Sequence, residues 1–567
     1  MTRSGATFVG IIEVVLGAAG CAGHRVEARA AAAGRLAGIE TSYGELRSLR
    51  DTLDITRARG LERTPNGDAL EAGDRRFEDA RVRIRRMVAD VDSLPLRAAD
   101  RRALLTMERA LDTDLAGTAS EPAAPDAAND RCDAGQRTPD MAIGDTAAAR
   151  TLRRHVYDCF GRAASQIVVD GDTIDRLTTL ARIAGAPDPA YRQRLFLALE
   201  PLWRAVNGDD GVRSPYRTLL RLTAAQGAGA NPSPLERAAD VGVAPATLER
   251  WLVTILDAWR AATPDSAVEP WDYYYMAAEA DRRLSARIPR DSLLAVTERY
   301  YMTLGADITA LGVHYDLEPR AGKDPVANTT FGSRGHAVGD RWVRAESWVF
   351  ATYETGGLGN LDELVHETGH GIHLSAIHER PAYEDWPDSD PLTEAIADIP
   401  ALSVYEPLWQ WRFLGDSVTT AVATRAKYAS IMLDIAWGLL EVRLHDHPDA
   451  DPNQVWTDIT SRYLHIAPHP ALSWWAMRGQ LIDAPGYMMN YALGAVIVTA
   501  IRERIRVVHG SFAGGDQTWY PWLSAHLLRY GLARPTRDLL REFLGGPLSA
   551  DPLLRDLARM RTTARGR

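Results

Sequence analysis

The sequence predicts a mainly α-helical fold that includes one small β-sheet. Long stretches of the 567-residue chain repeat apolar residues every three or four positions, as amphipathic helices require. One short stretch, residues 341–353, is instead rich in Trp, Val, Phe and Tyr, which favours strands. A composition of 46% hydrophobic and 25% charged residues is ordinary for a folded globular protein.

The helical pattern comes in three blocks. The first covers residues 25–115 and is rich in Ala, Leu, Arg and Glu. Residues 116–145 then contain few large apolar side chains and many Ala, Pro, Asp and Gly, which predicts a loop or a disordered excursion. The second block covers residues 146–304, and the third begins at residue 361, directly after the predicted strands.

The charge and hydropathy of the chain exclude some partners. A formal net charge of −10 argues against nucleic acid, because phosphate binding favours a basic surface. Beyond the N-terminus, no stretch reaches the length of a transmembrane helix. The most apolar candidate, residues 492–501, is too short and runs into charged residues.

Residues 1–25 are typical of an export signal. Arg3 precedes an apolar run over residues 8–19, and small residues follow. Cys21 ends the sequence Ala-Ala-Gly-Cys, which resembles the box at which a bacterial lipoprotein is cleaved and lipidated. We therefore expect an exported protein, either secreted or attached to the cell envelope through a lipidated Cys21. Glu13 within the apolar run departs from this pattern, so a cytoplasmic protein with an apolar first helix is the alternative.

The two remaining cysteines, Cys132 and Cys159, bear on the same question. An exported chain could pair them, because disulfides persist in oxidising compartments. Two unrelated thiols are the alternative, since sequence alone does not supply the geometry that a bridge requires.

The sequence of residues 366–370 is His-Glu-Thr-Gly-His. On a helix, positions four apart share a face, so the imidazoles of His366 and His370 can bind one metal ion. Glu367 then lies beside the metal without binding it, placed to accept a proton from a water molecule. Asn360, followed three residues later by Glu363, predicts the N-terminal cap of this helix.

A hydrolytic zinc site uses three protein ligands and keeps one position open for water. Glu394 and Asp398 also lie four positions apart on a predicted helix. We assign Glu394 as the third ligand of one zinc ion, and Asp398 as the carboxylate that orients a ligating histidine. The alternatives are two solvent-facing histidines on an ordinary helix, or a structural zinc, which usually has four protein ligands. His373 and His469 are expected to be structural residues.

Residues 361–370 (LDELVHETGH) and 394–404 (EAIADIPALSV) resemble the angiotensin-converting-enzyme family of gluzincin metallopeptidases, and more loosely the thimet oligopeptidase family. The resemblance implies a large helical ellipsoid in which two halves flank a deep central channel, with a small β-sheet beside the zinc-binding helix. Residues 26–567 would then form one catalytic domain that admits short, flexible peptides. It also implies that Ala337 lies in the strand segment that pairs with the peptide backbone.

Residues 485–491 (PGYMMNY) resemble the segment that carries the family's catalytic tyrosines. The resemblance implies that Tyr491 donates to the oxyanion of the intermediate and that Tyr487 contacts the substrate. Aromatic residues packed on a helix are the alternative. Arg478 matches a basic residue that binds the free C-terminal carboxylate of the substrate. A solvated surface arginine is the alternative there.

Two positions depart from the family pattern. Gln480 stands where the family has a histidine that donates to the intermediate, and glutamine cannot become cationic. The arginine between the two tyrosines, linked to chloride activation, is missing.

We therefore expect zinc-dependent hydrolysis of short oligopeptides, with release of C-terminal dipeptides as the leading mode. An endo-acting oligopeptidase of the thimet type shares the metal site but not the carboxylate anchor. A catalytically inactive, surface-anchored binding lipoprotein that keeps the fold is the second alternative, motivated by Gln480.

Overall fold

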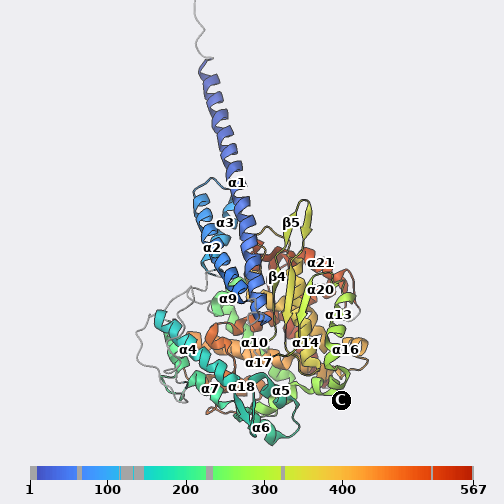
Figure 1. Cartoon of the computed structure of the whole chain (residues 1–567). Helices are drawn as coiled ribbons and strands as arrows, with labels where there is room; N and C mark the ends of the chain where they lie inside the picture. The colour runs from blue at the N-terminus through green and yellow to red at the C-terminus, as the bar shows by residue number, and fades with distance from the viewer. Residues whose placement is uncertain are drawn as a thin grey trace, which may run out of the picture.

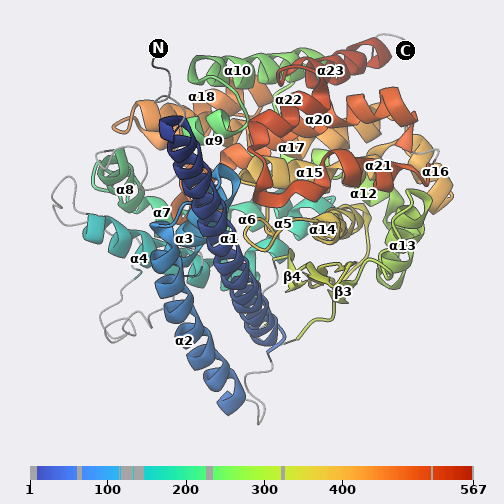
Figure 2. The same cartoon turned by 90° about the horizontal axis from the view of Figure 1, so that it is seen from above.

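The computed structural model describes residues 9–60, 67–113, 115, 132, 146–224, 234–320, 323, 326–512 and 515–564. Helices make up most of the described chain and the strands are few and short, so the mainly α prediction is confirmed (Figures 1 and 2). Residues 1–8, the side chain of Cys21 and the predicted loop 116–145, apart from Cys132, lie outside the described residues. The export signal, the lipidation and the loop therefore stay predictions.

The elements follow one another along the chain in three groups. The N-terminal group consists of α1 (Val9–Ala58), α2 (Gly67–Asp92) and α3 (Ala98–Asp112). The middle group consists of α4 (Thr146–Ala164), β1 (Ile167–Val169), β2 (Asp172–Ile174), α5 (Arg176–Gly185), α6 (Pro189–Leu197), α7 (Glu200–Asn207), α8 (Pro215–Ala224), α9 (Pro234–Asp240), α10 (Pro245–Ala262), α11 (Pro270–Ala277), α12 (Glu279–Leu284) and α13 (Leu293–Thr303). The C-terminal group consists of β3 (Val313–Asp316), β4 (Asn328–Ser333), β5 (His336–Val338), β6 (Arg341–Val343), β7 (Glu346–Phe350), α14 (Leu358–Ala376), α15 (Asp390–Ala401), α16 (Pro407–Leu414), α17 (Thr420–Asp446), α18 (Pro452–Leu464), α19 (Gln480–Asp483), α20 (Met488–His509), α21 (Trp519–His526), α22 (Thr536–Leu544) and α23 (Asp551–Ala564).

The first three helices form an arm with its own apolar core, separate from the large core of the remaining helices. The helix α1 extends well beyond the body of the molecule (Figure 1). The arm is joined to the body by ion pairs, among them Arg334 with Asp51, whose side chains are each 8% exposed. None of the helices in the described ranges combines the length and the apolarity needed to span a bilayer.

The small sheet next to α14 has the strand order β3-β7-β4. β3 runs parallel to β7, and β4 runs antiparallel to it. β5 and β6 form a separate antiparallel hairpin. The aromatic stretch 341–353 supplies β6 and β7, as the sequence predicts. The other strands of these two sheets were not predicted, because they are short and carry little of the alternating apolar pattern that identifies a half-buried strand.

The start of α14 differs from the sequence prediction. The helix begins at Leu358 with Gly357 as its cap residue, and Asn360 lies inside the first turn. The carboxylate of Asp281, from α12, accepts the main-chain N–H of Leu358. The Asn360 side chain instead donates to the main-chain oxygen of Thr355 at 2.9 Å. The predicted capping box is therefore wrong, because a residue distant in the sequence caps the helix.

Two glycines allow α14 to approach its neighbours closely. A Cβ atom on Gly369 would lie 2.8 Å from the main-chain oxygen of Ala397 on α15. A Cβ atom on Gly371 would lie 2.9 Å from the side chain of Val313 on β3. Any larger residue at either position would push α14 away from its partner. The glycine inside the His-Glu-Thr-Gly-His sequence thus sets the distance between α14 and α15.

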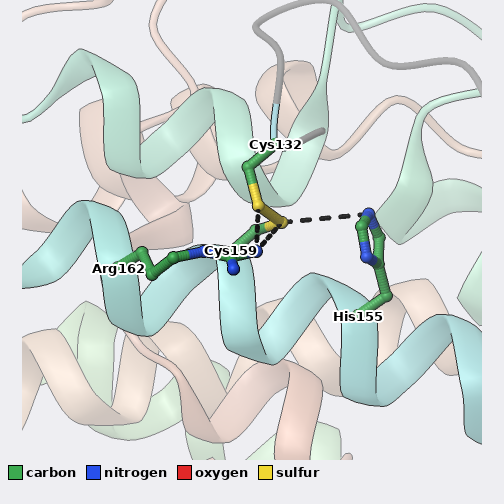
Figure 3. The surroundings of a disulfide bond; sticks show 4 residues. All are labelled: Cys132, His155, Cys159 and Arg162. Atoms are coloured by element: carbon green, nitrogen blue, oxygen red, sulfur yellow. Dashed lines mark hydrogen bonds between the residues drawn. A yellow bond between two sulfur atoms is a disulfide. The ribbon is translucent and has the colours of Figure 1, made fainter. Parts of the chain in front are cut away.

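Cys132 and Cys159 form a disulfide with a Cα–Cα distance of 5.5 Å (Figure 3). Arg162, one turn after Cys159 on α4, donates toward both sulfur atoms. The pairing that the sequence left open is thus present. It ties the chain around residue 132 to α4, which packs against α19.

Candidate metal centre

The structure brings the three predicted metal ligands together. His366 and His370 lie on α14 and Glu394 lies on α15, and one ligand atom of each lies within 4.8 Å of the others. The two imidazole rings are nearly perpendicular, with their centroids 4.7 Å apart. Among the described residues, this is the one group of three or more His, Cys, Asp and Glu side chains close enough to share an ion.

Asp398 lies one turn after Glu394 and holds the first histidine. Its Oδ1 atom is 2.7 Å from Nδ1 of His366. The other ring nitrogen, Nε2, is left facing Glu394, whose Oε2 atom is 3.5 Å away. Burial opposes the charge on His366, but the carboxylates of Asp398 and Glu394 raise its pKa well above the usual value in the metal-free chain. This concentration of negative charge suits a bound cation.

His370 is prepared for a metal in a different way. Its side chain is 8% exposed, and burial holds its pKa well below the usual value, so the imidazole is neutral. A neutral imidazole has the free lone pair that metal binding requires. Two imidazoles and one carboxylate form the donor set of a catalytic zinc site with one open position. The residues present therefore fit zinc.

Glu367 lies between the ligands and the sheet. It is 7% exposed, and its Oε2 atom accepts a 2.6 Å hydrogen bond from the hydroxyl of Thr329 on β4. The same hydroxyl lies 2.9 Å from the main-chain oxygen of Glu367. Burial raises the pKa of Glu367 to about 7, the range in which a carboxylate is an effective base near neutral pH. The contact with Thr329 was missed, because no sequence signal links the two positions.

Tyr487 and Tyr491 lie at the start of α20, next to the third ligand. A Cβ atom on Gly494, one turn after Tyr491, would lie 3.7 Å from Cβ of Glu394. The two phenol rings are 5.7 Å apart. Burial, and after it the charge of Glu394, raise the pKa of both tyrosines, to about 12 for Tyr487. Both hydroxyls therefore stay protonated and can donate hydrogen bonds.

Hydrogen bonds to a carboxylate on α17 hold the turn that carries Tyr487. The carboxylate of Glu441 accepts the N–H of Gly486 at 2.7 Å and that of Met488 at 2.9 Å. Gly486 has a φ of 85°, a conformation that glycine adopts without strain. A buried acceptor on another helix thus replaces a local cap for α20.

Arg478 is not the solvated surface residue that the sequence left open as an alternative. Its side chain is 27% exposed, and its guanidinium lies 2.5 Å from the carboxylate of Asp434 and 4.7 Å from the ring centre of Trp437. Arg176, the first residue of α5, lies beside it and donates to the main-chain oxygen of Met477 at 3.3 Å. Arg176 was not predicted, because it is about three hundred positions away and has no motif around it.

The remaining predicted site residues have more ordinary surroundings. Gln480 is half-buried at the first position of α19. Ala337 is exposed in the β5–β6 hairpin, where it pairs with Trp342. It does not belong to the three-stranded sheet, whose edge strand β4 carries Thr329 beside Glu367. His469 contacts the carboxylate of Glu269 at 2.6 Å, away from the ligands.

Comparison with known proteins supports the fold. No family model and no curated protein matches the chain. Trypanosoma cruzi metallocarboxypeptidase 1 is 12% identical with a TM-score of 0.55, over 93% of this chain and 99% of that chain. An M32 carboxypeptidase from Deinococcus radiodurans R1 is 13% identical with a TM-score of 0.54, over 94% of this chain and 100% of that chain.

Pz peptidase A, solved with an inhibitor, is 14% identical with a TM-score of 0.55, over 94% of this chain and 97% of that chain. The chain shares its fold with these solved peptidases. Each alignment covers more than nine-tenths of both molecules, so the likeness extends well beyond the helices that carry the ligands. Identities this low show the fold alone, and the activity has to be argued from the site.

Proposed function

We propose that the protein is a zinc-dependent peptidase that cleaves short, unstructured peptides. The observation that carries this proposal is the convergence of His366, His370 and Glu394, with one ligand atom of each within 4.8 Å of the others. Glu367 on the same helix and Asp398 behind His366 complete the arrangement that peptide hydrolysis needs. The metallopeptidase fold supports the same conclusion.

When bound at these ligands, zinc would polarise the scissile carbonyl and lower the pKa of the attacking water. Glu367 accepts the proton of that water and later passes it to the leaving amine. Thr329 holds the Glu367 carboxylate in place through its 2.6 Å hydrogen bond. Tyr491 donates a hydrogen bond from its phenolic hydroxyl to the developing oxyanion, and this role needs no ionisation of the tyrosine. Asp398 keeps the ring of His366 oriented with Nε2 toward the third ligand.

We further propose that substrates are held by their free C-terminal carboxylate and lose a dipeptide. Arg478 lies near Tyr491 and Arg176 lies beside Arg478, and among the described carboxylates only Asp434 is within ion-pair distance of these two guanidinium groups. Burial, and to a lesser extent the positive charge of Arg478, lower the pKa of Arg176 to about 10. A substrate carboxylate would supply the missing negative charge. An endo-acting oligopeptidase would have no use for such an anchor.

Cleavage of quenched peptides tests the proposal. Peptides of several lengths, with free and amidated C-termini, are incubated with the wild type and with Glu367→Ala, and the zinc content of both is measured. We expect about one zinc ion per chain in both proteins, cleavage by the wild type alone, and a strong preference for free C-termini. Equal cleavage of amidated peptides would favour the endo-acting alternative. Zinc without any cleavage would favour the inactive binding protein.

We also propose that the protein is exported and anchored through Cys21. The disulfide between Cys132 and Cys159 supports export, because such bonds persist in oxidising compartments. The full chain and Cys21→Ser, expressed in a bacterial host, should partition differently, with the wild type in the membrane fraction and the variant soluble. Wild type found in the cytoplasm with an unmodified N-terminus would contradict this proposal.

A further inference from the structure

Three buried ring nitrogens on α14 have no hydrogen-bond partner among the described residues. They are Nδ1 of the metal ligand His370 and both nitrogens of His373. The His373 side chain is 1% exposed, so water outside the protein does not reach it. Buried polar atoms in folded proteins nearly always find a partner, and exceptions commonly mark a functional arrangement. The two residues therefore need a common explanation.

The two histidines lie one turn apart on the same face of α14, since positions three apart on a helix are neighbours. Both rings make T-shaped contacts with Trp386, with centroid distances of 5.6 Å for His370 and 5.7 Å for His373. Trp386 in turn packs against Phe331 of β4. Nδ1 of His370 and both nitrogens of His373 make no hydrogen bond to the described residues, although both rings lie against the same indole.

His366 has a hydrogen-bond acceptor at its Nδ1 atom, and His370 has none among the described residues. Asp398 accepts the Nδ1 hydrogen of His366 and so fixes which nitrogen is free for the metal. Ligating histidines in proteins almost always donate their second N–H to such a partner. No carboxylate or main-chain oxygen of the described residues takes the Nδ1 hydrogen of His370. A neutral imidazole has one unprotonated nitrogen, so His373, which is 1% exposed, can accept this hydrogen.

We propose that His373 is a positioning residue for His370, accepting its Nδ1 hydrogen through one buried water or a small rotation of either ring. This bond leaves Nε2 of His370 for the metal and holds the ring at a fixed angle to that of His366. The inference rests on the proposed zinc site and gives a role to a residue that the sequence predicts to be structural. Because His373 accepts as a neutral group, it adds no charge to the site, and the negative charges there are those of Glu394, Glu367 and Asp398.

Zinc affinity of the full chain tests this role directly. His373→Phe keeps a flat aromatic ring and removes both nitrogens, whereas His373→Gln keeps an acceptor. His378→Phe is the matched control, because His378 is exposed and stacks on Trp342 at 4.1 Å, away from the ligands. In competition with a chromophoric chelator, we expect His373→Phe to bind zinc about 10- to 100-fold more weakly than the wild type. His373→Gln should recover most of that loss, and His378→Phe should match the wild type.

A second measurement needs no variant. Long-range proton–nitrogen NMR of the zinc-loaded wild type, labelled on histidine, should show a slowly exchanging proton on Nδ1 of the ligand His370. Wild-type affinity in a folded His373→Phe protein, or a rapidly exchanging Nδ1 proton, would overturn the role of His373 alone. A wild-type chain that binds no zinc would overturn the metal site itself and this role with it.

Discussion

The metal side of the site and its substrate side are built in different ways. The metal side consists of two pairs of residues, each four positions apart on one helix, together with Glu367: His366 with His370 on α14, and Glu394 with Asp398 on α15. Helix geometry alone places the members of each pair on one face. The packing of α14 against α15, which Gly369 allows to be close, then brings the two pairs together.

The substrate side consists of four residues from three parts of the chain. Tyr487 lies just before α20 and Tyr491 lies on it, and the arginines are Arg478, before α19, and Arg176 on α5. No helical spacing links the arginines to the tyrosines. Their positions depend on contacts with other helices, such as the ion pair of Arg478 with Asp434. The metal side is therefore set by local sequence, and the substrate side is set by the packing of distant segments. Substitutions on the two sides should change different measured quantities.

The largest expected effect is on the rate of the chemical step. Tyr491→Phe removes the proposed oxyanion donor and keeps the ring, so kcat should fall about 10²- to 10³-fold with KM nearly unchanged. Tyr487→Phe, one turn earlier, is the matched control and should change KM more than kcat. Steady-state kinetics on one quenched peptide measures both. A kcat of Tyr491→Phe within a few-fold of the wild type would remove this tyrosine from the mechanism.

The next effect concerns the metal side. Asp398→Asn removes the negative charge behind His366 and leaves the shape, so zinc affinity should fall about 10- to 100-fold. Asp390→Asn is the control on the same helix, since Asp390 pairs with Arg237 and its side chain is 58% exposed. Chelator competition measures the affinity of both. Equal zinc binding by the two variants would contradict the role given to Asp398.

A smaller effect is expected at the carboxylate anchor. Arg176→Gln removes one of the two guanidinium groups, so KM for peptides with a free C-terminus should rise about tenfold, the equivalent of one charged hydrogen bond. Amidated peptides should show no such change. Arg182→Gln, on the exposed side of the same helix α5, is the control. An identical rise in KM for both kinds of peptide would show that Arg176 supports the fold and not the carboxylate.

The same contrast explains how much of the site could be predicted from sequence. The ligands, Glu367 and Asp398 follow from spacing within helices, because a four-residue interval has one geometric meaning there. Arg176 and Thr329 could not be found this way, since each reaches the site through tertiary contacts with residues far along the chain. The predicted cap of α14 was wrong for the same reason, because Asp281 from α12 caps the helix in place of the local Asn360.

At the fold level, the long amphipathic helices and the two strands within residues 341–353 were predictable from their patterns. The strands β3, β4 and β5 were not, because each has only three to six residues, too few to show a clear alternating apolar pattern. The separate core of the α1–α3 arm was likewise invisible, since periodicity shows that a helix has an apolar face but not which helix covers it.

The smallest expected effect concerns the pKa of the base Glu367 and leaves the metal ligands unchanged. The Thr329 hydroxyl donates to the Glu367 carboxylate, which favours the charged form and lowers its pKa. Thr329→Val removes this hydrogen bond, so the pKa of Glu367 should rise. Because Glu367 accepts a proton only when it is deprotonated, the acid limb of kcat/KM should move to higher pH by about half a unit to one unit.

Zinc affinity should not change in Thr329→Val, because the threonine contacts no ligand, and activity well above neutral pH should stay close to that of the wild type. Thr330→Val, the next residue on β4, is the matched control and should leave the pH profile unmoved, since its side chain points to the opposite face of the strand. A shift in both variants would indicate that the strand itself, through its packing against α14, sets the environment of the base. A shift in Thr329→Val alone would tie the pKa of the base to the hydroxyl of Thr329, which contacts Glu367 from the sheet.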